Sequence, residues 1–188
     1  MVDVFENIYR ARSWGGRGCG PGSELAATGV IARVLPVLVH GVGARYVLDA
    51  ACGDGSWMPD LLPAGYVGVD IVPSALEAAR KYHPHRTYLL EDIRRDPLPH
   101  ADLVVCRDAM MHMPLEDGVA TLSNLRATGA TWIVATSFTD GTNEEVPPGG
   151  FYHINLEAEP FGLGRPWMVI EDNWRHEDKI LGVWTKES

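Results

Sequence analysis

The sequence predicts an α/β fold, namely a doubly wound, mostly parallel seven-stranded sheet with helices on both faces and a C-terminal β-hairpin. Three observations lead to this prediction. Short apolar strands rich in Val and Leu alternate with helical segments, which is typical of a buried parallel sheet. A glycine-rich turn follows the first of these strands. Two further strand-like segments end the chain and resemble a closing hairpin.

The elements are expected in a regular order along the chain. A helix is predicted over roughly 24–39, capped by Ser23 or by the glycine before it. Strands are predicted at 46–50, 66–70, 87–90, 101–106 and 131–137. Helices are predicted near 56–62, at 74–82, from about 108, and at 115–127. The hairpin is predicted from 167–171 and 180–185, packed by Trp167, Trp174 and Trp184.

Length and composition fit one domain, 1–188, in which 1–40 form a lid and helix and 41–188 form the core. The net charge of −9 argues against a nucleic-acid partner, which would need clustered Lys and Arg. No signal peptide is expected, because the first residues lack a basic start followed by an apolar run, and no apolar run is long enough to predict a membrane-spanning helix. Its three dispersed cysteines are interpreted as free thiols, so a cytoplasmic location is expected.

The stretch from Tyr46 to Trp57 runs from an apolar strand through Asp49 into a turn that contains Gly53 and Gly55. The next predicted strand ends in a second carboxylate, Asp70. Glycines let the backbone approach a ligand closely, and a carboxylate at a strand end can accept hydrogen bonds from both ribose hydroxyls. The pair predicts a nucleoside site, although each feature alone could also serve only a turn or a helix cap.

From about residue 25 onward the chain resembles the class I S-adenosylmethionine-dependent methyltransferases, and its first residues are similar to small stand-alone members. The family's glycine-rich motif is matched at Leu48, Asp49, Cys52, Gly53 and Gly55. The resemblance implies S-adenosyl-L-methionine as methyl donor and S-adenosyl-L-homocysteine as product. It implies ribose binding by Asp70 and adenine binding by Asp92 and Ile93. The implied donor-binding residues are Asp49, Ala50, Cys52, Gly53, Gly55, Trp57, Asp70, Ile71, Asp92, Ile93 and Arg107.

Two other function classes stay open from the sequence. One is a nucleotide-dependent oxidoreductase, which is disfavoured because Met58 occupies the third glycine position of a dinucleotide fingerprint. The other is a non-catalytic, S-adenosylmethionine-binding activator subunit of a larger methylase. The cluster of polar residues after the fourth predicted strand argues against the second class.

That cluster contains Arg107, Asp108 and His112, which are the predicted catalytic residues. If the segment is helical, Asp108 and His112 share a face and the carboxylate can orient the imidazole as a general base. Arg107 is expected either to position a neighbouring acid or to bind an anionic acceptor. The equally weighted alternative is a half-buried histidine that is hydrogen-bonded to a backbone carbonyl.

Other candidate acceptor-binding residues lie in two loop regions. Tyr9, Arg10 and Trp14 belong to the glycine-rich N-terminal segment, and Tyr152 and Asn155 follow the fifth strand. A frayed terminus and ordinary loop decoration are the alternatives. We expect O-methylation of a small molecule, with room for an anionic group and no metal. N-methylation of a small amine, and a monomer or a homodimer, remain open.

Overall fold

The computed structural model describes residues 1–63, 65–172 and 175–186, so the expectation for Trp174 lies outside the described residues. The helices are α1 Val2–Ala11, α2 Leu25–Thr28, α3 Ile31–Gly41, α4 Pro73–Tyr82 and α5 Leu115–Ala127, with short 3-10 helices η1 Pro21–Ser23 and η2 Met110–His112. The strands are β1 Tyr46–Ala50, β2 Gly65–Asp70, β3 Thr87–Leu90, β4 Leu103–Cys106, β5 Trp132–Phe138, β6 Met168–Glu171 and β7 Lys179–Thr185.

The strands form one seven-stranded sheet in the order β3-β2-β1-β4-β5-β7-β6. Strands β1 to β5 are parallel, and β7 runs antiparallel to both β5 and β6. The predicted fold class and the closing hairpin are therefore confirmed. The strand order reverses between β1 and β4, which is where ligands of open parallel sheets bind, outside the carboxyl ends of the strands.

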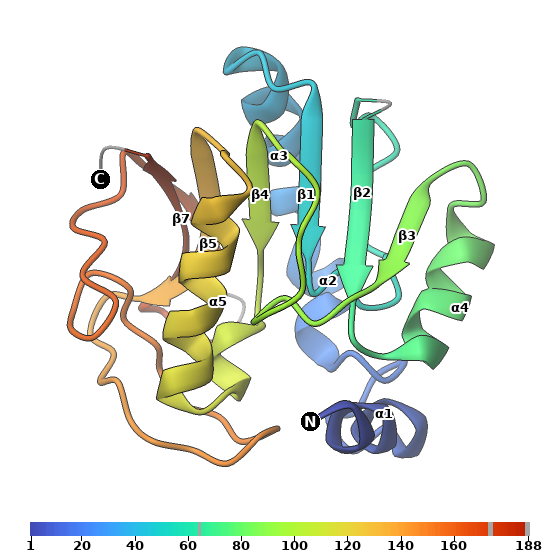
Figure 1. Ribbon diagram of the computed structural model, residues 1–188, viewed down its shortest axis with the longest axis horizontal. Coiled ribbons are helices and arrows are strands. Elements are labelled where there is room, and N and C mark those ends of the chain that lie inside the picture. Colours follow the sequence, from blue (N-terminus) through green and yellow to red (C-terminus); the bar gives the residue numbers. More distant parts are fainter. Residues whose placement is uncertain (64, 173–174, 187–188) are drawn as a thin grey trace.

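Helices cover both faces of the sheet (Figure 1). On one face, α3 buries Ile31, Leu35 and Leu38, whose spacing of four and three residues follows the helical period. Helix α4 packs on the same face through Leu76. On the other face, α5 contributes Leu125 to a separate apolar cluster. These two clusters hold the strand ends rigidly in place.

Helix α1 lies at the edge of the sheet where the strand arrows end (Figure 1). The sequence analysis left residues 1–22 without a helix, so α1 was missed. Its signal is the spacing of Val4, Phe5 and Ile8, although α1 has no fully buried residue. None of the described helices is long and apolar enough to cross a membrane.

The helix predicted over 24–39 is two helices, because the chain turns at Gly29 between α2 and α3. Glycine is a poor helix former, and the hydroxyl of Thr28 donates to the carbonyl of Glu24 (3.0 Å), an arrangement that often bends helices.

The helix predicted near 56–62 is wrong, because this segment consists of turns. Asp54 accepts a hydrogen bond from the Ser56 backbone N–H (3.0 Å), which closes a turn in place of a helical start. Arg86 binds the carbonyl of Pro59 (2.5 Å), and Pro63 ends the segment. The turn after β1 therefore does not lead directly into a helix N-terminus.

The helix expected from about 108 is also shorter than predicted. Asp108 has a left-handed backbone (φ 53°), and only the 3-10 turn η2 follows before Pro114. In the hairpin, Trp184 is fully buried and its Nε1 donates to the Gly164 carbonyl (2.9 Å). Trp167 is 60% exposed and lies against Trp132, with ring centroids 5.0 Å apart.

Candidate functional site

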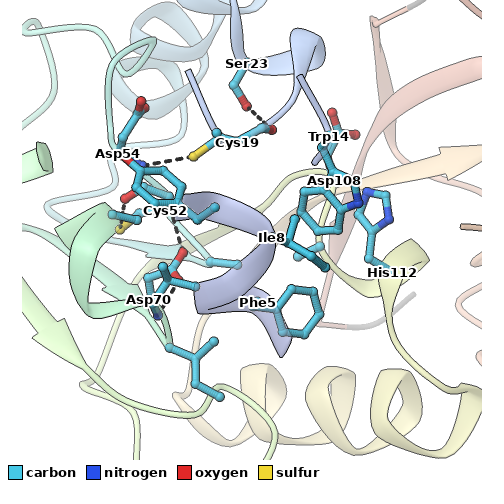
Figure 2. A pocket seen from close by; sticks show the side chains of 18 of the residues that line it. Phe5, Ile8, Trp14, Cys19, Ser23, Cys52, Asp54, Asp70, Asp108 and His112 are labelled. Carbon is cyan, nitrogen blue, oxygen red and sulfur yellow. Dashed lines mark hydrogen bonds between the residues drawn. The ribbon is translucent and has the colours of Figure 1, made fainter. Parts of the chain in front are cut away.

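Three adjoining hollows lie at the carboxyl ends of β1, β2 and β4. The central cavity has a volume of about 120 Å³, the outer cavity about 330 Å³ and the side hollow about 30 Å³. Figure 2 shows the central cavity, which has one group of side chains on one side and a second group on the other. The first group is Cys52, Asp54 and Asp70, and the second is Trp14, Asp108 and His112.

The glycine-rich turn forms one wall of the central cavity. Gly53 and Gly55 both have left-handed backbones (φ 57° and 63°), and so does Ala51 (φ 64°). A Cβ atom on Gly53 would lie 2.8 Å from Sγ of Cys19 in the N-terminal segment. That Sγ also accepts a hydrogen bond from the Asp54 backbone N–H (3.4 Å). The N-terminal segment is thus seated directly on the turn, which only glycine allows.

Asp70 ends β2 and lines both the central cavity and the side hollow. One carboxylate oxygen accepts a hydrogen bond from the Gly53 backbone N–H (2.7 Å), and the other accepts one from Val72 (2.9 Å). Burial raises the pKa of Asp70, while these N–H groups oppose the rise. Asp70 therefore holds the turn and the start of α4 together while it lines both hollows.

Asp49 of β1 pairs with Gly68 of β2, two residues before Asp70. It lines the central cavity and accepts a hydrogen bond from the Tyr66 hydroxyl (2.7 Å). Burial raises the pKa of Asp49 to about 7, in spite of this hydrogen bond. Trp57 lines the same cavity, and the Arg107 guanidinium lies 5.4 Å from the centre of its ring.

The side hollow is lined by Ile71, Asp92 and Ile93, and by Phe5 of α1. The Asp92 carboxylate is already bound by Arg94, through Nε (2.8 Å) and Nη2 (2.6 Å), and by Arg95 (2.8 Å). Burial alone would raise the pKa of Asp92, but the guanidinium groups outweigh it and lower the pKa.

A buried ionic quartet lies between the central and outer cavities. Lys179 contacts both oxygens of Asp108 (2.8 and 3.0 Å) and one oxygen of Asp172 (3.0 Å). Arg107 donates two hydrogen bonds to Asp172 (3.0 and 2.8 Å) and one to the Gly22 carbonyl (3.0 Å). Burial would raise the pKa of Asp108, but Arg107 and Lys179 hold it down to about 2. The charges of the quartet cancel.

His112 lines both the central and the outer cavity and stacks on Trp14, with ring centroids 4.4 Å apart. Its Nδ1 lies 2.6 Å from the Gly150 carbonyl oxygen. Because a carbonyl only accepts, Nδ1 carries the hydrogen and the lone pair of the neutral ring is on Nε2. Burial lowers the pKa of His112 below 6.5. The expectation that Asp108 orients this ring by a shared helical face is wrong, because Asp108 lies outside η2 and binds Lys179.

The structure brings most of the predicted site residues to the three hollows, but not all of them. Tyr9 and Cys52 line the central cavity, whereas Ala50 and Gly55 only border residues that do. Besides Ala50 and Gly55, three predicted residues line none of the three hollows: Arg10, which pairs with Glu6, Tyr152, which is buried, and Asn155, whose side chain donates to the Gly141 carbonyl (3.4 Å).

Five residues that line the cavities were not predicted from the sequence, namely Phe5, Ile8 and Cys19, and also Asp172 and Lys179 of the quartet. Their signals were weak because each side chain reaches the site from a distant part of the chain. Among the described residues, no group of three or more His, Cys, Asp or Glu side chains is arranged to hold a metal ion.

Comparisons with known proteins agree with this arrangement. Residues 47–128 match the family described as a methyltransferase domain. No curated protein matches the chain. The structure is similar to magnesium protoporphyrin IX methyltransferase from Synechocystis PCC 6803 with bound S-adenosylmethionine, at 18% identity and a TM-score of 0.70, covering 98% of this chain and 96% of that one.

Two further solved structures are also similar. The N-methyltransferase NodS from Bradyrhizobium japonicum WM9, in complex with S-adenosyl-L-homocysteine, is 13% identical with a TM-score of 0.67, covering 95% of this chain and 98% of that one. The methyltransferase domain of bacterial CtHen1 is 16% identical with a TM-score of 0.63, covering 85% and 99%. These likenesses establish the shared fold. The domain match and this fold together support a class I S-adenosylmethionine-dependent methyltransferase.

Proposed function

We propose that this protein transfers the methyl group of S-adenosylmethionine to a hydroxyl oxygen of a small molecule. In this proposal the donor occupies the central cavity and the side hollow, and the acceptor occupies the outer cavity. The two cavities share Trp14, Cys19, Arg107, Asp108 and His112 in their walls, so a donor and an acceptor would meet at these residues.

The proposed donor pose uses the chemistry of each hollow. Asp70 accepts hydrogen bonds from the ribose hydroxyls, and Ile71 and Ile93 contact the adenine ring in the side hollow. The carboxylate of Asp49 faces the cationic part of the donor in the central cavity. Asp92 contributes mainly by shaping the hollow, because two arginines already occupy its carboxylate.

The observation that carries the proposal is the contact between Nδ1 of His112 and the Gly150 carbonyl oxygen (2.6 Å), at the meeting point of the cavities. Because the Nδ1–H group donates a hydrogen bond to the Gly150 carbonyl, Nε2 carries the lone pair that can take a proton from an acceptor hydroxyl. The oxygen then attacks the methyl carbon, the C–S bond breaks, and neutral S-adenosylhomocysteine leaves with the electron pair on sulfur. Arg107 and Asp108 position this region through the quartet.

The test compares two substitutions at position 112. His112→Asn can still donate to the Gly150 carbonyl but offers no base, whereas His112→Ala loses both features. With methyl-labelled donor and a metabolite extract, we expect turnover to fall by about 100-fold or more in both variants, the usual size of a general-base contribution. Donor affinity, measured by calorimetry, should stay unchanged in His112→Asn.

Each contrary result points to a different alternative. Wild-type turnover in His112→Asn would show that His112 is not a general base, and it would favour N-methylation of a neutral amine, which needs none. Label found only in protein or nucleic acid would overturn the small-molecule acceptor. Donor binding without any transfer would favour a non-catalytic subunit, and binding of a nicotinamide cofactor in place of the donor would favour an oxidoreductase.

A further inference from the structure

The walls of the outer cavity are made largely of flat rings from separate segments. Trp14 comes from the N-terminal segment, His112 from η2, Phe151 from the loop after β5, and His176 from the segment before β7. Trp14 stacks on His112 with centroids 4.4 Å apart, and Phe151 meets His112 at 5.8 Å. Phe151 also stacks on His176 (5.9 Å). His112 therefore contacts one aromatic ring from each of two other segments.

Exposure separates these rings from ordinary packing. Phe138 stacks on His153 with centroids 4.3 Å apart, and Phe138 is fully buried, so that pair serves the core. Phe151, in contrast, is 46% exposed although it belongs to the same group of rings. A large aromatic side chain left half exposed on a cavity wall keeps ring surface available to a ligand.

The four quartet charges that line the outer cavity are paired with one another, and Arg175, which also lines this cavity, lies outside the quartet. The Lys179 ammonium has contacts to Asp108 and Asp172, and the Arg107 guanidinium is paired twice with Asp172. These four groups are formally neutral as a set, so they do not select a carboxylate or phosphate. Recognition then rests mainly on the rings.

The base favours one kind of hydroxyl. A neutral imidazole removes a proton most readily from a donor group whose pKa is not far above the pKa of the imidazole. A phenol, with a pKa of about 10 as in tyrosine, meets this condition. An aliphatic hydroxyl, whose pKa lies close to that of water and far above that of a phenol, does not.

We propose that the acceptor is a planar aromatic compound with an ionisable hydroxyl, bound with its ring against Trp14 and Phe151 and its hydroxyl at Nε2 of His112. The inference rests on the proposed function, because it specifies the acceptor of the same O-methylation. The phenolic proton passes to Nε2, an aryl–O–CH₃ bond forms, and the C–S bond of the donor breaks.

The first experiment uses methyl-labelled S-adenosylmethionine with three matched sets of compounds: one- and two-ring phenols, the corresponding cyclohexanols, and the corresponding anilines. We expect label in the phenols, as aryl methyl ethers identified by mass spectrometry. Comparable transfer to cyclohexanols or anilines would overturn the aromatic-hydroxyl acceptor while leaving methyl transfer intact. Absence of label in every phenol, in a preparation that binds the donor, would also overturn it.

The second experiment locates the ring-binding site. Phe151→Leu removes ring stacking but keeps apolar volume, and we expect KM for the best phenol to rise roughly three- to tenfold. Donor affinity and kcat should change little. The matched control is Trp167→Leu, which removes an exposed aromatic ring from the β6 region and should leave KM unchanged. An unchanged KM in Phe151→Leu would show that the ring does not bind the acceptor.

Discussion

At the scale of single residues, we expect Asp49 to make donor binding depend on pH. Its pKa is about 7 in the free protein because of burial, with Asp70 adding to the rise and Tyr66, Arg86 and Arg107 opposing it. A cationic donor favours the ionised carboxylate, so binding releases the proton. We expect donor affinity roughly tenfold weaker at pH 6 than at pH 8, measured by calorimetry in two buffers of different ionisation enthalpy.

The folding stability of the free protein depends on pH in the opposite direction to donor affinity. Because the folded pKa of Asp49 is raised above 3.8, its contribution to the stability of the free protein is complete below pH 3.8 and is lost as pH rises through about 7.

The matched variant for the affinity prediction is Tyr66→Phe, which removes a hydrogen bond to the ionised form of Asp49 (2.7 Å). Its affinity midpoint should move to higher pH. A donor affinity that stays flat between pH 6 and 8 in the wild type would contradict this assignment.

Individual site residues were predictable when sequence neighbours fix them. Asp49, Gly53 and Asp70 were found because a strand end and its following turn lie together in sequence and in space. The orientation of the His112 ring could not be predicted, because its hydrogen-bond partner is the carbonyl of Gly150, 38 residues away. A backbone carbonyl leaves no mark on the sequence, so only the alternative of a backbone-bonded histidine anticipated this contact.

At the scale of elements, α1 closes the central cavity without being part of the core. Phe5 and Ile8 line the cavity, and Glu6 accepts a hydrogen bond from the Ser74 backbone N–H of α4 (3.3 Å). A Cβ atom on Gly149 would lie 2.5 Å from Cδ1 of Ile8, so α1 also rests on the loop after β5. The helix therefore joins the side proposed for the donor to the side proposed for the acceptor.

We expect Phe5→Ala to weaken donor binding at least about tenfold, since burying a side chain of this size is worth about 1.5–3 kcal/mol. Thermal unfolding should be nearly unchanged, because no residue of α1 is fully buried. Asp3→Ala, an exposed position on the same helix, serves as the control. Equal donor affinity in Phe5→Ala and Asp3→Ala would mean that α1 does not cover the bound donor.

Prediction of elements succeeded where apolar periodicity was the signal and failed where local turn chemistry competed. The parallel strands and α5 were found because their apolar residues follow strand and helix periods. The helix prediction for residues 56–62 was wrong because Asp54 and Pro59 are held by turn and side-chain hydrogen bonds. The helix α1 was overlooked because the glycines that follow it dominate the composition of the N-terminal segment.

At the scale of the whole molecule, the fold class followed from the alternation of elements, but the ionic quartet did not. Its members come from the ends of β4 and β6 and the start of β7, and Arg107 also holds Gly22. Sequence separations of this size are not readable from local patterns. The quartet thus links the N-terminal segment, the sheet and the hairpin, and its integrity should govern global stability.

The quartet predicts a non-additive result for two substitutions. Asp172→Asn leaves an excess positive charge among side chains that are almost entirely buried, and we expect a loss of about 3–5 kcal/mol in the free energy of unfolding. Lys179→Met leaves an excess negative charge in the quartet. The double variant restores neutrality with Arg107 and Asp108, so its loss should be smaller than the sum of the two single losses. Urea unfolding of all four proteins measures this coupling, and strictly additive losses would show that the four charges do not act as one unit.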